Sequence, residues 1–154
     1  MLRFLATAIA LSIALASPSL FVSRALAADA KPHHIAIQVD QNDPQVMNLA
    51  LGNATNVIEY YRSKNEEVDI DITAYGPGLH MLRADTSPVK DRLKRMKDMV
   101  FPGKIQFSAC HNTMQNMAKA EGHPIEIVSE ATEVPSGVVH LNELQEQGWS
   151  YVKP

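Results

Sequence analysis

Two hydrophobic periodicities alternate along this chain, and this alternation restricts the fold more than any other feature. In residues 34–40 and again in residues 68–75, apolar side chains recur at every second position, as they do in β-strands. Between these stretches, Asp43-Pro44 offers an N-cap and a first-turn proline. Apolar residues then recur at spacings of three and four to about Lys64, which predicts a helix. Strand–helix–strand units of this kind join parallel strands, because a parallel pair needs a long crossover.

The same alternation continues to the C-terminus, where three more strands and three more helices are expected. In chain order they are a helix from Ser87-Pro88 to Val100, a strand over 104–109, a helix capped by Asn112 or Thr113 and stopped by Gly122 and Pro124, a strand at about 126–129, a helix from Ser136 to Gly148, and an edge strand over 149–152. The sequence therefore predicts one α/β domain with a mostly parallel five-stranded sheet and helices on both faces.

The N-terminal segment has the composition of a secretory signal peptide. Arg3 precedes an apolar stretch from Phe4 to Ala16, and Ala25-Leu26-Ala27 supplies small residues for cleavage before Ala28. The apolar stretch is short for a membrane span and is followed by Ser17-Pro18-Ser19, so a cleaved leader is favoured over a membrane anchor. We therefore expect a leader at 1–27, an α/β domain at 28–154 and export to a bacterial periplasm.

The charge balance after cleavage disfavours two classes of partner. Arg3 and Arg24 leave with the leader, which lowers the number of basic residues from 14 to 12 against 17 acidic residues, for a net charge of −5. A mildly acidic domain is poorly suited to general nucleic-acid binding or to an anionic membrane surface. No nucleic acid and no membrane is expected as a partner of the mature chain.

Cys110 is the only cysteine of this chain, and it stands where a predicted strand meets a predicted helix. Exported proteins usually pair their cysteines, so a single one is either an inert buried thiol or a reactive one. A thiol at a helix N-terminus faces unpaired N–H groups and the positive end of the helix dipole, which stabilise the thiolate. The position thus favours a reactive thiol at the carboxyl end of a strand, where sites in parallel sheets form.

Four segments of the chain form a recognisable set: HHIAIQVD, the Tyr-Gly-Pro-Gly-Leu loop, FSACHNTM around the cysteine, and the tail VPSGVVHLNELQEQGWSYVKP. In this order they resemble the exported single-domain branch of the DsrE/DsrF-like family of sulfur-relay proteins. The resemblance spans essentially the whole mature chain and implies an α/β sheet of flavodoxin-like type and assembly into trimers or hexamers. It also implies a cysteine, here Cys110, that carries sulfur as a persulfide.

The favoured hypothesis is a periplasmic sulfur carrier in which Cys110 takes sulfur from a sulfane-sulfur donor and passes it to an acceptor thiol. Such an exchange needs no metal and no organic cofactor. With one cysteine, the chain cannot act as a CxxC oxidoreductase. The residues expected to support Cys110 from the two neighbouring loops are Gly76, Gly78, His80, His111, Asn112 and Thr113. Glu130 and Glu133, at the end of the fourth predicted strand, are in a position to reach the same rim.

Two other function classes remain open from the sequence, a metal or small-ligand binding module and a non-catalytic oligomeric interaction protein. Cys110 and His111, with His80 and His140, have the ligand softness for copper or zinc, although no spacing matches a known ligand set, and His33, His34 and His123 suit surface positions. The helix from Pro88 to Val100 has a basic stripe suited to an anionic partner in a non-catalytic interaction protein, but it fits a solvated helix face better.

The acidic residues near the second strand carry a simpler interpretation. Glu66, Glu67, Asp69 and Asp71 surround the entrance of that strand. Solvation at the surface is a simpler explanation for these carboxylates than a role in acid–base catalysis. Gly76-Pro77-Gly78 is read as a tight loop, and it lacks the length of a phosphate-binding glycine motif.

Overall fold

The computed structural model describes residues 32–99 and 103–154, so the predicted leader at 1–27 lies outside the described residues. Its five strands form one all-parallel sheet in the order β4-β3-β2-β1-β5, which agrees with the predicted sheet. The strands are β1 (His33–Val39), β2 (Val68–Ala74), β3 (Gly103–Cys110), β4 (Ala131–Val134) and β5 (Ser150–Val152).

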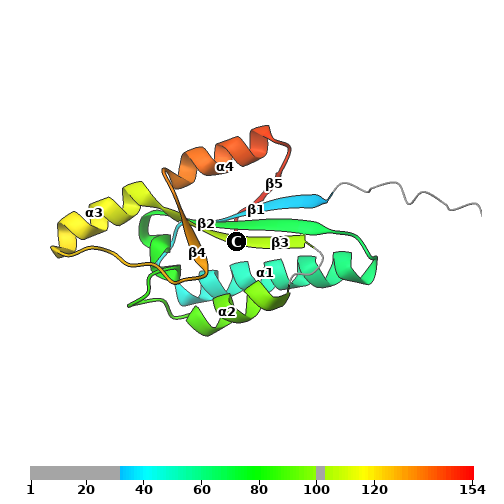
Figure 1. Cartoon of the computed structure of the whole chain (residues 1–154), viewed down its shortest axis with the longest axis horizontal. Helices are drawn as coiled ribbons and strands as arrows, with labels where there is room; N and C mark the ends of the chain where they lie inside the picture. The colour runs from blue at the N-terminus through cyan, green and yellow to red at the C-terminus, as the bar shows by residue number, and fades with distance from the viewer. Residues whose placement is uncertain (1–31, 100–102) are drawn as a thin grey trace, which may run out of the picture.

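Helices cover the two faces of the sheet unequally (Figure 1). They are α1 (Pro44–Ser63), the 3₁₀ helix η1 (Gly76–Met81), α2 (Lys90–Met99), α3 (His111–Glu121) and α4 (Gly137–Glu146). In Figure 1, α1 and α2 lie below the sheet and α4 lies above it, while α3 extends past the carboxyl ends of the strands. No helix of the described chain is both long and apolar enough to cross a membrane.

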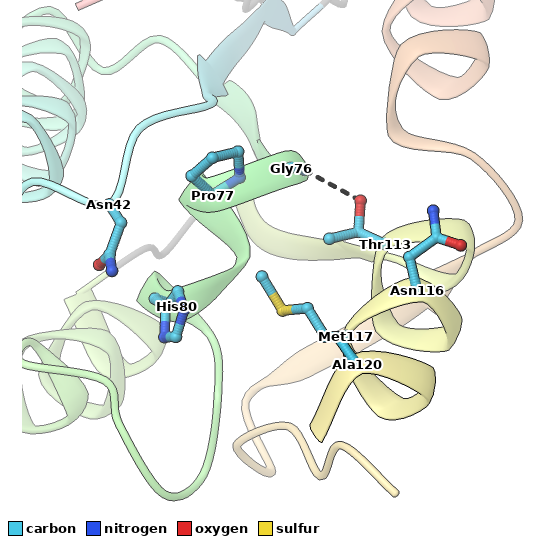
Figure 2. A pocket seen from close by; sticks show the side chains of 8 residues that line it. All are labelled: Asn42, Gly76, Pro77, His80, Thr113, Asn116, Met117 and Ala120. Atoms are coloured by element: carbon cyan, nitrogen blue, oxygen red, sulfur yellow. Dashed lines mark hydrogen bonds between the residues drawn. The ribbon is translucent and has the colours of Figure 1, made fainter. Parts of the chain in front are cut away.

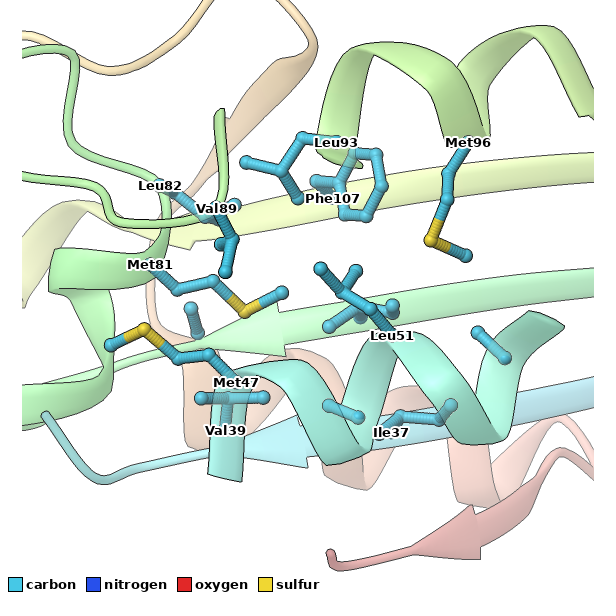
Figure 3. Packing of buried hydrophobic residues seen from close by; sticks show 14 of the residues in the cluster. Ile37, Val39, Met47, Leu51, Met81, Leu82, Val89, Leu93, Met96 and Phe107 are labelled. Atoms are coloured by element: carbon cyan, nitrogen blue, oxygen red, sulfur yellow. The ribbon is translucent and has the colours of Figure 1, made fainter. Parts of the chain in front are cut away.

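The main core lies between the sheet and the pair α1 and α2 (Figure 3). The strand register aligns Ile37 of β1, Ile72 of β2 and Phe107 of β3 across this face. Leu51 from α1 and Leu93 from α2 pack onto them, and all five side chains are buried. The predicted cap of α1 is confirmed, since Asp43 Oδ1 accepts a hydrogen bond from Gln45 N at 2.7 Å.

The opposite face of the sheet is polar along β2 and β3, and we call it the polar face. It bears the side chains of Asp69, Asp71, Thr73, Lys104, Gln106, Ser108 and Cys110. Among the described residues, α4 is the one helix that covers it, and the buried residues of α4 are Gly137, Leu141 and Leu144. Parallel strands that are covered on both faces usually carry continuous apolar runs. The alternation in β2 and β3 therefore reflects one apolar and one polar face.

Helix α3 has no buried residue, and an arginine ties it to the body of the domain. The side chain of Arg83 is only 2% exposed and forms paired hydrogen bonds with two carboxylates. Its Nε and Nη2 donate to Asp85 at 2.9 and 2.6 Å, and its Nη1 and Nη2 donate to Glu121 at 2.6 and 2.8 Å. Because Glu121 is the last residue of α3, this arginine fixes the far end of the helix.

The strand predicted at about 126–129 is wrong in position. Residues 126–128 pair antiparallel with residues 82–84 instead, through Ala84 N to Glu126 O and Val128 N to Leu82 O, both 2.9 Å. The strand that joins the sheet begins at Ala131, after a turn in which Ala131 N bonds Val128 O. The apolar residues near 127 thus mark a segment that is buried outside the sheet.

Two local expectations are also corrected. Gly76-Pro77-Gly78 is not an isolated tight loop but the start of η1, whose proline occupies the first turn. Helix α3 begins at His111, so its N-cap residue is Cys110 rather than Asn112 or Thr113. The predicted end of that helix is confirmed, because Gly122 adopts a left-handed conformation with φ of 75°.

Candidate functional site

Cys110 is both the last residue of β3 and the residue that caps α3. Its side chain belongs to the polar face, two residues after Ser108, and the residue is 5% exposed. The neighbouring strand β4 pairs with it through Val134. The sequence correctly predicted this address at the carboxyl end of the third strand, and the structure adds that the thiol is buried.

Hydrogen-bond donors from two helices converge on the sulfur of Cys110. Burial raises the pKa of the thiol, but the Thr113 hydroxyl and the backbone N–H groups of Gly137, Thr113 and Asn112 lower it further than burial raises it. The net effect is a pKa below the ordinary value for cysteine. Asn112 and Thr113 lie in the first turn of α3, and Gly137 is the first residue of α4. The sulfur therefore lies between two helix N-termini, an environment that favours the thiolate.

Gly137 allows this close approach because it has no side chain. A β-carbon at this position would lie 2.9 Å from Cβ of Tyr75 and 3.3 Å from Cβ of Cys110. Neither Gly137 nor Tyr75 is among the site residues predicted from the sequence. A glycine directly after the helix-capping Ser136 was the available signal, since glycine disfavours helix interiors and marks close backbone contacts.

Thr113 connects the cysteine to the glycine loop, as the prediction of a shared rim requires. Its Oγ1 accepts a hydrogen bond from Gly76 N at 2.9 Å, and its hydroxyl also bonds the sulfur of Cys110. Gly76 and Thr113 are thus brought together beside the cysteine. Asn112 donates its backbone N–H to the sulfur of Cys110, and its N also lies 3.4 Å from Pro135 O.

A cavity of about 430 Å³ opens between η1 and α3 (Figure 2). The residues that line it are Asn42, Gly76, Pro77, His80, Thr113, Asn116, Met117 and Ala120. Figure 2 shows the hydrogen bond from Gly76 to Thr113 at one end of the cavity and His80 at the other. Cys110 does not line this cavity, so Thr113 is the one side chain that contacts both the cavity and the sulfur.

The remaining predicted site residues lie apart from the sulfur. Gly78 packs against β1, where any β-carbon would overlap the carbonyl of Val39. His80 Nδ1 lies 2.9 Å from Thr86 Oγ1. His111 Nδ1 lies 2.5 Å from Glu133 Oε1, and both side chains are about half exposed. These contacts give Gly78 a packing role and engage both histidines with other partners.

The hypothesis of a metal site has no matching set of ligands in the part of the chain that the structure describes. Across 32–99 and 103–154, no three His, Cys, Asp or Glu side chains gather closely enough to hold an ion. Of the four residues considered from the sequence, His80, His111 and His140 each contact a different partner, and Cys110 receives backbone donors.

A buried polar cluster under α4, formed by Asp71, Thr73, Ser108 and His140, was not predicted from the sequence. Asp71, which was interpreted as a solvated surface residue, is 2% exposed. Thr73 Oγ1 donates to its Oδ1 and Ser108 Oγ to its Oδ2, both at 2.7 Å. His140 Nε2 lies 3.0 Å from the same Oδ2 and 3.3 Å from Ser108 Oγ. The hydrogen bond with Asp71 raises the pKa of His140, against the opposing effect of burial.

Comparisons with known proteins bear on the fold. A scan against protein-family models found no match, and a search of curated proteins found none either. Among solved structures, the chain is similar to MTH1491, a protein of unknown function from Methanobacterium thermoautotrophicum, with a TM-score of 0.65 and 26% sequence identity. The match covers 79% of this chain and 99% of that one. It agrees with the predicted single α/β domain of flavodoxin-like type and leaves the activity open.

Proposed function

We propose that this chain is a periplasmic sulfur carrier of the DsrE-like type, in which Cys110 holds sulfur as a persulfide. The observation that carries the proposal is the set of donors on the sulfur, which come from the N-termini of α3 and α4 and lower the pKa of the thiol. The thiolate is the form of cysteine that attacks sulfur, and its fraction at neutral pH rises as the pKa falls.

The proposed reaction is an exchange of sulfur between thiolates. The Cys110 thiolate attacks the outer sulfur of a donor such as thiosulfate, a new S–S bond forms, and the old one breaks to release sulfite with its bonding electron pair. The resulting persulfide anion then loses its outer sulfur to the thiolate of an acceptor molecule, which restores the Cys110 thiolate. No net oxidant or reductant is consumed.

The environment of Cys110 supports this chemistry in one further way. The chain has no second cysteine, so a persulfide on Cys110 has no partner within the chain to resolve it as a disulfide. The backbone N–H groups that face the Cys110 sulfur also favour negative charge on a persulfide attached to it. Burial of the residue at 5% exposure also limits further oxidation by solvent oxidants.

Intact mass spectrometry of the mature chain, starting at Ala28, tests the proposal. After exposure to thiosulfate or inorganic polysulfide, the wild-type protein is expected to gain a sulfur atom that a reducing agent removes. Cys110→Ser is the matched control and is expected to gain none. A folded wild-type protein that takes up no sulfur from either donor would contradict the proposal.

A second measurement separates a carrier from a protein that is merely modified. The loaded wild-type protein is mixed with a small thiol, and the release of its sulfur to that thiol is followed by mass. Loss of the extra sulfur from Cys110 with formation of the small-molecule persulfide is expected. Irreversible loading would instead indicate a terminal modification.

A further inference from the structure

Helix α4 contacts the sheet through few apolar side chains. Its buried apolar residues, Leu141 and Leu144, form a small cluster with Ala36 of β1. Tyr75 and Trp149 complete this cluster from its edges. The remaining surface beneath the helix is the polar face, so apolar packing alone defines the placement of α4 weakly. A polar contact is therefore needed to fix the first turn of this helix against the sheet.

His140 provides that contact. Its Nε2 lies 3.0 Å from Asp71 Oδ2, and the two side chains are 19% and 3% exposed. The carboxylate is itself held by hydroxyl groups of Thr73 and Ser108, each at 2.7 Å. Asp71 is thus a fixed acceptor in the middle of the sheet, and α4 is attached to it through one side chain.

The attachment lies in the same helical turn that reaches the cysteine. His140 N bonds Ser136 O at 2.9 Å, which closes the first turn of α4 around Gly137. The backbone N–H of Gly137 donates to the sulfur of Cys110. Ser108, which His140 also contacts at 3.3 Å, lies two residues before Cys110 on the same strand face. The first turn of α4 therefore joins His140, which contacts Asp71, to the N–H of Gly137, which donates to the sulfur.

We propose that His140 is a positioning residue for Cys110, which it serves by holding the first turn of α4 where the N–H of Gly137 reaches the sulfur. Its relevance to sulfur transfer rests on the proposed function, but its effect on the thiolate does not. The other charged groups around His140 are Glu143 on its own helix and Asp69 and Lys104, which line a cavity of about 230 Å³ together with it.

The test is the rate at which iodoacetamide alkylates Cys110, measured across a range of pH in the folded protein. His140→Ala is expected to move the profile to higher pH and to slow alkylation at neutral pH by up to about tenfold, the equivalent of one hydrogen bond to a charged group. His140→Gln, whose amide can still donate to Asp71, is expected to keep most of the wild-type rate.

A helix-loosening control separates positioning from general destabilisation. Leu144→Ala removes a buried contact in the last turn of α4, one turn after His140, and leaves the contact between His140 and Asp71 in place. It is expected to lower the melting temperature without moving the alkylation profile. A profile for His140→Ala that matches wild type would overturn the proposal, and so would an equal shift in Leu144→Ala. If His140→Ala does not fold, His140→Asn, with a side chain too short to reach Asp71, is measured in its place.

The alkylation experiment also remains informative if sulfur transfer fails. A wild-type protein that takes up no sulfur, yet shows a His140-dependent alkylation profile, would reject the proposed function and retain the positioning role. If wild type and His140→Ala take up sulfur equally and have equal alkylation profiles, the proposed function is retained and the positioning role of His140 is rejected.

Discussion

Backbone groups, more than side chains, define the environment of Cys110. Three of its donors are the N–H groups of Asn112, Thr113 and Gly137, and only the Thr113 hydroxyl comes from a side chain. Backbone donors cannot be removed by ordinary substitution, so their effect on the pKa of the thiol is tested through the residues that position them, as with His140. Two positions that contact Cys110 directly can also be substituted, the side chain of Thr113 and the missing side chain of Gly137.

Replacing Thr113 by Val tests the hydroxyl. The substitution removes the donor to the sulfur and the acceptor for Gly76 N, and it is expected to slow alkylation of Cys110 at neutral pH by up to about tenfold. Thr113→Ser keeps the hydroxyl and is expected to stay near the wild-type rate. Iodoacetamide kinetics at several pH values provide the measurement. Equal rates for the two variants would show that the hydroxyl does not act on the sulfur.

Replacing Gly137 by Ala tests the close approach of α4. The new β-carbon would lie 2.9 Å from Cβ of Tyr75 and 3.3 Å from Cβ of Cys110, so the start of α4 or Tyr75 must shift, which disturbs the contact with the sulfur. We expect slower alkylation at neutral pH and a lower melting temperature. Gly52→Ala, on the open surface of α1, is the matched control and is expected to raise stability by about 0.5–1 kcal/mol. A Gly137→Ala variant with wild-type kinetics would contradict the assigned contact.

The sequence was sufficient to locate Cys110 but not its surroundings. A single thiol at a strand end is visible in the sequence because its position follows from local periodicity alone. Gly137 and Asp71 lie 27 and 39 residues away along the chain, and only the parallel pairing of the strands brings them near. Asp71 was interpreted as solvated because its alternation with isoleucines does not reveal that α4 covers the polar face.

At the scale of elements, Arg83 holds α3 to the segment that precedes α2. The helix has no buried residue, so the hydrogen bonds between Arg83 and Glu121 fix its C-terminal end. Arg83 also lowers the pKa of Asp85 and of Glu121 by direct hydrogen bonds, against the smaller effect of desolvation. Both carboxylates therefore stabilise the folded state only while they are ionised.

Arg83→Met is expected to lower the melting temperature by about 5 °C near neutral pH, because two carboxylates lose their partner. Since both carboxyl pKa values are depressed in the folded protein, their contribution is present above about pH 4 and is lost as the pH falls through the folded values. The difference between wild type and variant should therefore narrow in acid. Thermal unfolding at several pH values measures it.

Arg95→Met removes an exposed arginine from α2 and serves as the control for the loss of one positive charge. It is expected to change the melting temperature little at any pH. A constant difference between wild type and Arg83→Met from neutral pH into acid would mean that the carboxylates are not the partners that matter.

Helices and strands with strong periodicity were predicted correctly, with the exception of the fourth strand. The cap of α1 at Asp43 and the glycine end of α3 at Gly122 both follow from local chemistry that the sequence displays. The fourth strand was misplaced because residues 126–128 are as apolar and extended as a sheet strand. Their pairing with 82–84 depends on a segment more than 40 residues earlier, which periodicity does not detect.

At the scale of the whole molecule, the sheet has one face buried in a large core and one polar face that, within residues 32–99 and 103–154, lies beneath α4 alone. Exposed apolar side chains on the α4 side include Val138 and Val139 of α4 and Tyr151 of β5, whose partner in β1 is Ala36. Val152, also exposed, pairs with Ile37 and therefore lies on the opposite side. The resemblance to sulfur-relay proteins predicts trimers or hexamers, and assembly of this kind stays a prediction. Light scattering of the mature chain measures its mass in solution directly.

Export is the prediction that concerns the entire chain. When the full sequence is expressed in a bacterium, we expect the protein in the periplasmic fraction to begin at Ala28, as determined by intact mass. Replacing Ala27 by a large residue, as in Ala27→Leu, is expected to block cleavage, because the leader needs small residues before the cut. A wild-type chain that retains residues 1–27 in the membrane fraction would contradict the leader.

The backbone origin of the donors on Cys110 has a consequence for how such proteins diverge. Peptide N–H groups at the starts of α3 and α4 donate to the sulfur, so the backbone fold itself lowers the pKa of the Cys110 thiol. Most neighbouring side chains can therefore change during evolution without removing these donors. Distant members of a lineage built this way would share little more than a cysteine that closes the third strand and a glycine that opens the last helix. That two-residue signature, applied to folded chains rather than to aligned sequences, is the practical means of finding them.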